Sequence, residues 1–104
     1  MAKTDERYAE AERLKDEGQL EEAVNKLEEL LGEDPDHVLS HLALAVLYGR
    51  LKRHDDAIRH GQKACELDPK DAFNFTAMSV TFQRAGKIPE AEDAMAQARM
   101  MQGH

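Results

Sequence analysis

The feature of this sequence that most limits its fold is an internal repeat of 34 residues. Pro35 and Pro69 lie at this offset, and each directly follows an aspartate. Residues of matching size recur at the same offset elsewhere: Ala11, Ala45 and Ser79; Leu14, Tyr48 and Phe82; Ala23, Ala57 and Ala91; Leu30, Ala64 and Ala98. Several matched series at one spacing indicate a stack of similar structural units.

Apolar residues within each unit are spaced as they are on one face of an α-helix. Leu20, Ala23, Leu27 and Leu30 follow steps of three and four residues, which is the helical period. We therefore predict an all-α fold with two helices per unit, in one domain that covers residues 1–104. The units are expected near residues 4–37, 38–71 and 72–104, and the six helices near 4–17, 20–33, 38–51, 54–67, 72–85 and 88–101.

The predicted turns follow from residues with unusual backbone preferences. Gly18 and Gly86 stand between the two helices of their units, where glycine adopts the left-handed backbone that ends a helix. Lys52 takes this place in the second unit. We expect its turn to cost about 1 kcal/mol more or to have a different geometry. At the other junctions, proline moves the preceding aspartate out of helical geometry, and Asp71 is expected to cap the helix that follows.

Composition and charge exclude several classes of partner. The formal net charge of -7 opposes binding to phosphate backbones or anionic lipid, so nucleic acid and membranes are not expected partners. The most apolar stretch, Val38 to Leu51, is too short to span a bilayer, and the charged amino terminus has no apolar export signal. A cytoplasmic location is the expectation, and Cys65, as the single cysteine, forms no intramolecular disulfide.

The aligned small residues, the aligned large residues and the prolines together resemble the tetratricopeptide repeat, a helix–turn–helix unit of 34 residues. The resemblance covers residues 4–104 and departs from the family at Gly61, where a large residue is usual. It implies a right-handed superhelical stack of three hairpins whose first helices line a concave groove. Such scaffolds bind a peptide or helix of another protein, so a protein or peptide with an apolar face is the expected partner.

The family register places one set of side chains in this groove. Repeat one contributes polar and acidic residues, whereas repeats two and three contribute mainly apolar ones. The predicted groove residues are Tyr8, Glu12, Leu39, Leu42, Val46, Arg50, Phe73, Thr76, Val80 and Arg84. We therefore expect a partner with an apolar face and a basic end. The alternative is a strongly curved stack that closes the groove, so that these apolar residues belong to the core.

One variety of the family binds the acidic carboxyl-terminal tails of chaperones through lysine, asparagine and arginine in the groove. The matching places in this chain hold other residues: Tyr8, Glu12, Ala43, Phe73 and Ala77. The resemblance therefore disfavours this mode of binding.

The last predicted helix supports a second hypothesis. Stacks of repeats usually end in a helix with a polar outer face, and no such helix follows Met101. Met95, Ala98 and Met101 lie at helical spacing, and methionine surfaces adapt readily to apolar partners. We therefore expect self-association, such as a homodimer, through this face as the alternative to groove binding.

No combination of residues in the sequence indicates catalysis, a cofactor or a metal site. His37 and His41 lie four residues apart, but no third metal ligand is near them. His54 and His60 are separated on their helix and are expected to face solvent. Cys65 points away from His60 and is expected to be a small packing residue. We therefore predict that the chain is not an enzyme.

Overall fold

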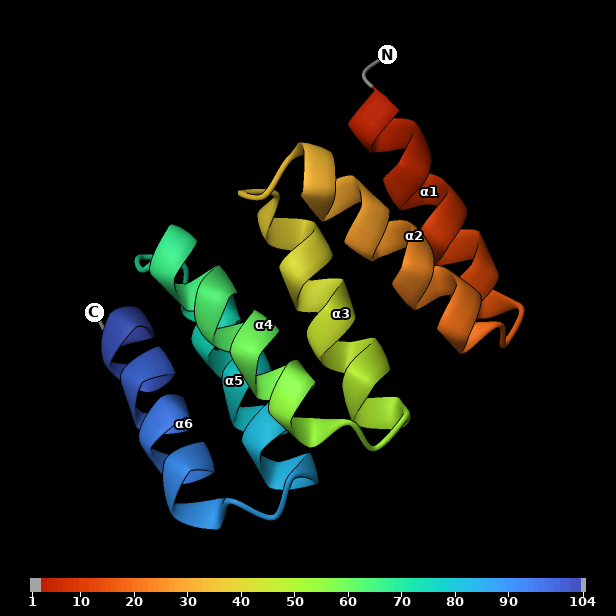
Figure 1. The fold of residues 1–104 in the computed structure, drawn as a ribbon. Coiled ribbons are helices and arrows are strands. Elements are labelled where there is room, and N and C mark those ends of the chain that lie inside the picture. The colour runs from red at the N-terminus through yellow and green to blue at the C-terminus, as the bar shows by residue number, and fades with distance from the viewer. Residues whose placement is uncertain (1–2, 104) are drawn as a thin grey trace.

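The structure, a computed structural model, describes residues 3–103 and contains six helices within them (Figure 1). The predicted bounds agree with the observed ones to within one residue at each end. The helices are α1 (Lys3–Asp16), α2 (Leu20–Glu33), α3 (Val38–Arg50), α4 (His54–Leu67), α5 (Ala72–Arg84) and α6 (Ile88–Gln102). The predicted all-α fold of three helical hairpins is confirmed.

The helices form three successive hairpins that stack along the chain (Figure 1). Each first helix packs mainly against the second helix of its own hairpin, and α2 with α3 and α4 with α5 join neighbouring hairpins. α3 also contacts α5, which brings the first helices of repeats two and three together on one face. This arrangement measures 37 × 28 × 20 Å.

The aligned small residues lie where helices approach most closely. Ala23 and Ala57 have no exposed surface, and Ser79 donates a hydrogen bond to the Ala91 carbonyl oxygen at 2.9 Å. The largest buried apolar side chains, Leu27, Leu30, Leu44 and Leu47, come from α2 and α3. Burial of each leucine contributes about 1.5–3 kcal/mol, so the core lies at the junction of repeats one and two.

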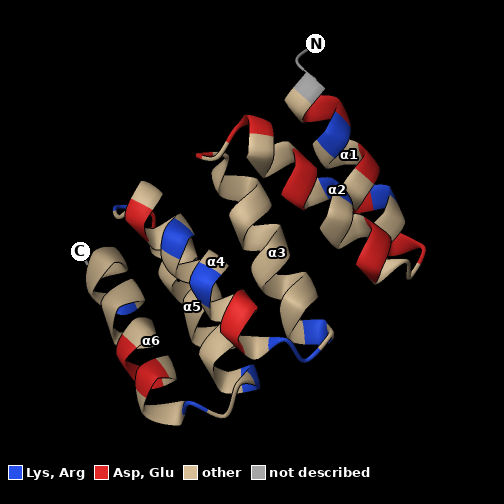
Figure 2. Ribbon diagram, in the orientation of Figure 1, with Lys and Arg blue, Asp and Glu red and all other residues tan. Residues whose placement is uncertain are grey.

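α3 is the most apolar helix and lies in the middle of the stack. Figure 2 shows that it is almost free of charged residues, with Arg50 at its end. Most of its side chains are buried, but Leu39 and Val46 remain exposed. Within the described part of the chain, no helix has both the length and the apolar character needed to cross a membrane.

The turns inside the three hairpins share one geometry. Gly18 has φ 82°, Gly86 has φ 78° and Lys52 has φ 64°. In each turn, the residue after this left-handed position donates its backbone N–H to the carbonyl oxygen of the residue five positions before it. These hydrogen bonds run from Gln19 to Leu14, from Arg53 to Tyr48 and from Lys87 to Phe82. The sequence predicted that the Lys52 turn has either a higher cost or a different geometry. The geometry is the same, because lysine adopts the left-handed backbone that favours glycine.

The junctions between hairpins also follow the sequence. Asp34 and Asp68, which precede Pro35 and Pro69, have non-helical backbones with φ -135° and -138°. The Asp71 side chain accepts a hydrogen bond from the Phe73 N–H at 3.0 Å, which confirms the predicted cap of α5. Gly61 stands where the family usually has a large residue, and Met78 fills the space that such a side chain would take. The Met78 sulfur lies 2.7 Å from the position that a Cβ would have at Gly61. The junction of α4 and α5 is therefore packed by methionine from the next repeat.

Candidate partner-binding groove

A cavity of about 260 Å³ lies on the face formed by the first helices of the hairpins. α1, α3 and α5 each contribute to it, since the hairpins stack with these helices on one side. It is lined by Tyr8, Glu12, Lys15, Leu39, Leu42, Ala43, Val46 and Phe73. The structure thus brings six of the predicted groove residues around one cavity, together with Lys15 and Ala43.

The apolar residues of this face are accessible. Phe73 is 61 % exposed and Leu39 is 53 % exposed, while Val46 and Val80 are each 41 % exposed. Exposed apolar side chains of this size that gather on one face are typical of binding surfaces. The groove is therefore open, and the alternative in which these residues form part of the core does not hold in this structure.

The α1 end of the groove carries less free charge than the sequence suggests. The Lys15 ammonium lies 3.4 Å from the Glu12 carboxylate, so the two side chains partly neutralise each other. Tyr8 packs edge-on against the His37 ring, with 5.6 Å between the ring centres. Burial, together with the nearby Glu12 charge, raises the pKa of Tyr8, so its hydroxyl stays protonated and available as a donor.

The other predicted groove residues lie outside the cavity. Arg50 and Arg84 end α3 and α5 and are exposed, and the Arg84 side chain lies close over Gly49. The Thr76 hydroxyl donates to the Ala72 carbonyl oxygen of its own helix at 3.3 Å. The face therefore runs from a nearly neutral end at α1, across apolar side chains, to two guanidinium groups.

A buried pair of histidines is the feature that sequence reasoning missed. His60 was expected to face solvent, but it is 3 % exposed, and His41 is 6 % exposed. Their Nδ1 atoms lie 3.0 Å apart, and His41 Nε2 lies 2.8 Å from the Pro35 carbonyl oxygen. Because a carbonyl only accepts, His41 Nε2 carries the proton, so in the neutral pair His60 Nδ1–H donates to His41 Nδ1.

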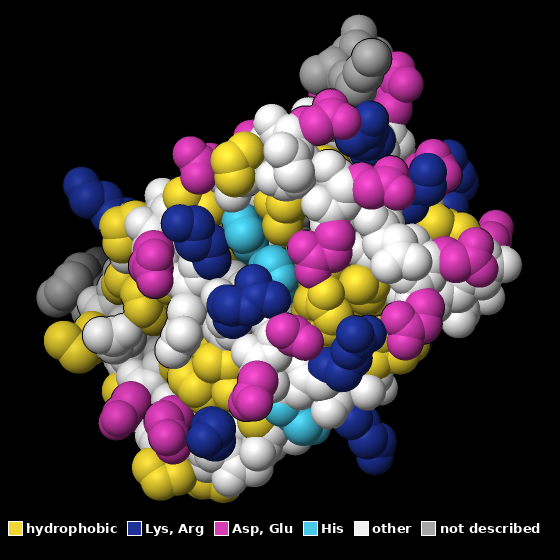
Figure 3. Space-filling view, viewed as in Figure 1, with side chains coloured by type: hydrophobic (Ala, Val, Ile, Leu, Met, Phe, Trp, Pro, Cys, Tyr) yellow, Lys and Arg dark blue, Asp and Glu magenta, His cyan; other side chains and the backbone are white. Residues whose placement is uncertain are grey.

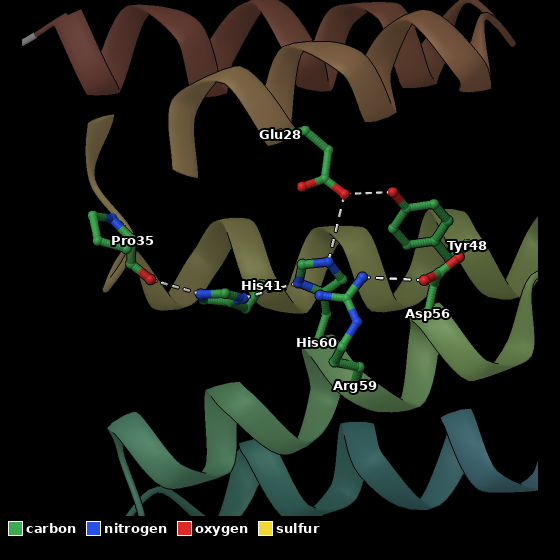
Figure 4. A network of polar contacts seen from close by, with 7 residues as sticks. All are labelled: Glu28, Pro35, His41, Tyr48, Asp56, Arg59 and His60. Carbon is green, nitrogen blue, oxygen red and sulfur yellow. Dashed lines mark hydrogen bonds and ion pairs between the residues drawn. The ribbon is translucent and has the colours of Figure 1, made fainter. Parts of the chain in front are cut away.

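This assignment leaves His60 Nε2 without a proton, and the atom faces a carboxylate (Figure 4). It lies 3.6 Å from Glu28 Oε2, and the same carboxylate accepts a hydrogen bond from the Tyr48 hydroxyl. The Tyr48 ring stacks on His60, with 5.7 Å between the ring centres. The network therefore joins α2, α3 and α4, and ties repeat one to repeat two.

Titration of the network is shifted by its surroundings. Burial lowers the pKa of His60, and the charges of Arg59 and His41 act in the same direction, while Glu28 and Asp56 oppose them. Burial and the hydrogen bond to Glu28 raise the pKa of Tyr48. Near neutral pH His60 is therefore uncharged, and the network acts as a buried structural link.

Of the residues considered for chemistry, the structure pairs His41 with His60, while Cys65 has a different partner. The Cys65 thiol donates to the Asn74 carbonyl oxygen at 3.5 Å, and burial raises its pKa, which disfavours the reactive thiolate. Within residues 3–103, no group of three or more histidine, cysteine, aspartate or glutamate side chains has an arrangement that could hold a metal ion. His60 is used in the network with Glu28.

The residues predicted for self-association are divided by the structure. Ala98 is 1 % exposed and faces the interior, so its place in that surface was predicted wrongly. Met95 is half-buried, whereas Met101 is exposed, as is its neighbour Met100. Glu92, Asp93 and Arg99 of α6 are also exposed, so the surface of this helix is more polar than its alanines and methionines suggest.

Comparison with known proteins agrees with this architecture. The family model that matches residues 8–72 describes the tetratricopeptide repeat. No curated protein matches the chain. Among solved structures, the Yersinia enterocolitica type III secretion translocator chaperone SycD is 19 % identical with a TM-score of 0.87, over 97 % of this chain and 76 % of that chain.

Two further solved structures have the same fold. The second TPR of Spaghetti (RPAP3), bound to an HSP90 peptide, is 17 % identical with a TM-score of 0.84, over 94 % of this chain and 91 % of that chain. MamA is 15 % identical with a TM-score of 0.87, over 96 % of this chain but only 58 % of its own. At these identities the likeness concerns the fold. With its three stacked hairpins and a family match over more than half its length, this chain belongs to the tetratricopeptide repeat family.

Proposed function

We propose that this chain is an interaction scaffold that binds a segment of a partner protein in the groove formed by α1, α3 and α5. The observation that carries the proposal is the apolar cavity of about 260 Å³ flanked by exposed Leu39 and Phe73. Exposed apolar surface is costly in water, and here it is held by helices that are fixed by a well-packed core. A partner that covers it gains binding energy without reorganising the scaffold.

The size of the cavity favours a side chain over a small-molecule ligand. Pockets for small molecules usually have volumes of about 300–1,000 Å³, and this cavity is smaller. A single large apolar side chain of a peptide or helix fits the pattern of an anchor residue in a pocket. The surrounding residues Leu39, Val46 and Phe73 then cover the rest of the partner segment and exclude water.

The charged residues at the two ends of the groove differ, and this difference favours one orientation of the partner segment. Glu12 is paired with Lys15, which weakens the case for a basic end on the partner. Arg50 and Arg84 are exposed and, within the described residues, form no ion pair with an acidic side chain. We therefore propose an apolar anchor over α1 and α3, followed by an acidic or polar residue near the two arginines.

Related structures support binding by the fold but not the same ligand chemistry. The Spaghetti domain is bound to an HSP90 peptide, and another structure of this fold is the CopN–Scc3 complex. In this chain the places that the family resemblance assigns to the tail-binding mode hold Tyr8, Glu12, Ala43, Phe73 and Ala77. An apolar anchor is therefore proposed instead of a terminal carboxylate.

A peptide library displayed on phage and selected on the wild-type domain tests this function. We expect the selected peptides to share a large apolar residue, and L39D to weaken their binding by at least about tenfold, as loss of a buried anchor contact does. I88D is the matched control, because Ile88 is 50 % exposed but lies on α6, away from the groove. Circular dichroism confirms that both variants are folded.

The result that contradicts the proposal is equally specific. Peptides that bind L39D as tightly as the wild-type domain would place the site elsewhere. The same conclusion follows if selected peptides share no apolar residue. Loss of binding in both L39D and I88D, with helicity retained, would show general stickiness instead of a groove site.

Self-association through α6 is the second candidate function. It is favoured by Met100 and Met101, which are 73 % and 40 % exposed. Met95, on the same helix, is half-buried. Sedimentation equilibrium over a concentration series tests it: M101E is expected to shift a dimer towards monomer, and a wild-type chain that stays monomeric at high concentration would exclude it.

A further inference from the structure

Two equivalent grooves run between successive second helices, on the face shown in Figure 3. One groove lies between α2 and α4 over α3, and the other lies between α4 and α6 over α5. Most of their lining residues correspond at the repeat offset of 34: Glu28, Leu31, Gly32, His41, Arg59, His60 and Lys63 in the first groove align with Gln62, Cys65, Glu66, Phe75, Asp93, Ala94 and Gln97 in the second. The two grooves can therefore be compared residue by residue at these aligned positions.

The groove between α2 and α4 is occupied by the chain's own polar side chains. Glu28, His41 and His60 line a cavity of about 520 Å³ and belong to the hydrogen-bonded network. At its rim, Arg59 and Asp56 form an ion pair at 3.1 Å. Glu28, Arg59 and the two histidines of this groove therefore already have partners within the chain.

The groove between α4 and α6 has apolar residues in the same places. Phe75 replaces His41, Phe82 replaces Tyr48 and Ala94 replaces His60. These residues, with buried Met78, form the floor of a larger cavity of about 770 Å³. This volume lies within the range of about 300–1,000 Å³ that is usual for binding pockets, and two half-buried aromatic rings give it the apolar lining of one.

The rim of this second groove is acidic. Glu66, Glu90 and Asp93 line it, and no lysine or arginine does. Asp93 stands where Arg59 stands one repeat earlier, and Glu90 stands where Asp56 does. The ion pair of the first groove is thus replaced by two like charges three positions apart on a helix, which repel each other. Among the described residues, none of these three carboxylates has a recorded ion-pair partner.

We propose that the groove between α4 and α6 is a second docking site, for a basic amphipathic helix of a partner protein. Charge complementarity identifies the occupant, because an apolar floor with three unpaired carboxylates matches apolar side chains flanked by lysine or arginine. Phe75 and Phe82 are seven residues apart on α5, which corresponds to about 10 Å, or two helical turns. Glu66 lies near the Phe75 end, beside the α4–α5 turn, and Glu90 lies near the Phe82 end, beside the α5–α6 turn. A partner helix with basic residues about two turns apart meets both ends.

This site is independent of the concave groove. It is lined by α4, α5 and α6, whereas the cavity near Leu39 is lined by α1, α3 and α5, and the two cavities share no lining residue. The chain is therefore able to hold two partner segments at once. L39D separates the two sites, since it should leave binding in the α4–α6 groove unchanged.

A designed peptide tests the proposal directly. The probe is a fluorescent alanine-based peptide of about 18 residues, long enough to be helical in part, with phenylalanine and leucine on one face and lysines two turns apart. We expect saturable binding by anisotropy, with D93R, which recreates the acid–base pair of repeat two, weakening it by at least about tenfold. Asp93 is exposed, so the fold should be retained.

Matched controls decide between the site and general attraction to an acidic protein. E92R makes the same charge change one residue away on α6, outside this cavity, and should leave binding within about twofold of wild type. A peptide with glutamate in place of lysine, or alanine in place of phenylalanine, should not bind. In methyl NMR, the Met78 signal from the groove floor should shift on addition of the peptide, and the exposed Met100 signal should not.

Three results would overturn the proposal. The first is no saturable binding of the basic peptide at concentrations up to about 1 mM. The second is equal weakening by D93R and E92R, which would indicate net charge alone. The third is loss of binding in L39D with an unshifted Met78 methyl signal, which would place the peptide in the concave groove.

Discussion

Replacing Lys52 with glycine should raise the free energy of unfolding by about 1 kcal/mol. Lys52 holds φ 64° in a turn whose equivalents at Gly18 and Gly86 have the same geometry. A left-handed backbone costs a residue with a Cβ about 1–2 kcal/mol, and glycine avoids that cost. The greater conformational freedom of glycine stabilises the unfolded chain and offsets about 0.4–1 kcal/mol of this gain. Lys52 is exposed and has no recorded side-chain hydrogen bond or ion pair within residues 3–103, so its removal should lose little else.

Urea denaturation followed by circular dichroism measures this change, and a gain of this size corresponds to about 4–8 °C in Tm for a domain of this length. K52A is the control for the lost charge, because alanine keeps the strained backbone and should change stability little. G86K is the reciprocal control and should cost about 1 kcal/mol. A K52G variant no more stable than K52A, or a G86K variant as stable as wild type, would refute the argument from backbone strain.

Three further predictions concern the core, a helix cap and pH. L44A should lower the free energy of unfolding by about 2–5 kcal/mol, because Leu44 has no exposed surface; urea denaturation checks it, and a loss below 1 kcal/mol would contradict it. D71A should cost about 0.5–2 kcal/mol through loss of the α5 cap, whereas D71N, which keeps a capping oxygen, should cost much less in the same assay. Because burial lowers the pKa of His60 below its usual 6.5, the unfolded chain takes up a proton that the folded chain resists. The contribution of this group to stability is therefore full above pH 6.5 and falls as the pH drops towards the lowered pKa. The double variant H41F/H60A should reduce this decline. If the free energy of unfolding falls equally steeply with pH in the variant and in the wild type, the prediction is wrong.

The fold could be predicted from the sequence because its determinants recur. Each helix end repeats at the 34-residue offset, and each signal, such as Gly18 or Pro35, acts through local backbone preference. The residues around the concave cavity could be predicted for a related reason, since one register fixes which face of every first helix points the same way. The open state of the groove depends on curvature, which no local pattern encodes.

The histidine network could not be predicted from the pattern of α4 alone. Whether His60 is buried depends on Glu28 from α2 and on His41 and Tyr48 from α3, and the period of a single helix contains no information about those partners. The aligned positions Lys26, His60 and Ala94 also share no chemical character. One signal was present, because His41 aligns with Phe75 at a position where the family often has a large aromatic residue.

The same network gives the two junctions of the stack different chemical sensitivities. In a solenoid, stability is close to a sum of repeat terms and nearest-neighbour coupling terms. The coupling between repeats one and two includes a titratable link from Glu28 to His60. The coupling between repeats two and three uses Met78 and the hydrogen bonds from the uncharged Asn74 amide to the Ala64 and Asp68 carbonyl oxygens. Mild acid should therefore loosen the first junction before the second. Repeat one, which supplies the α1 wall of the groove with Tyr8, is the repeat whose attachment acid should weaken.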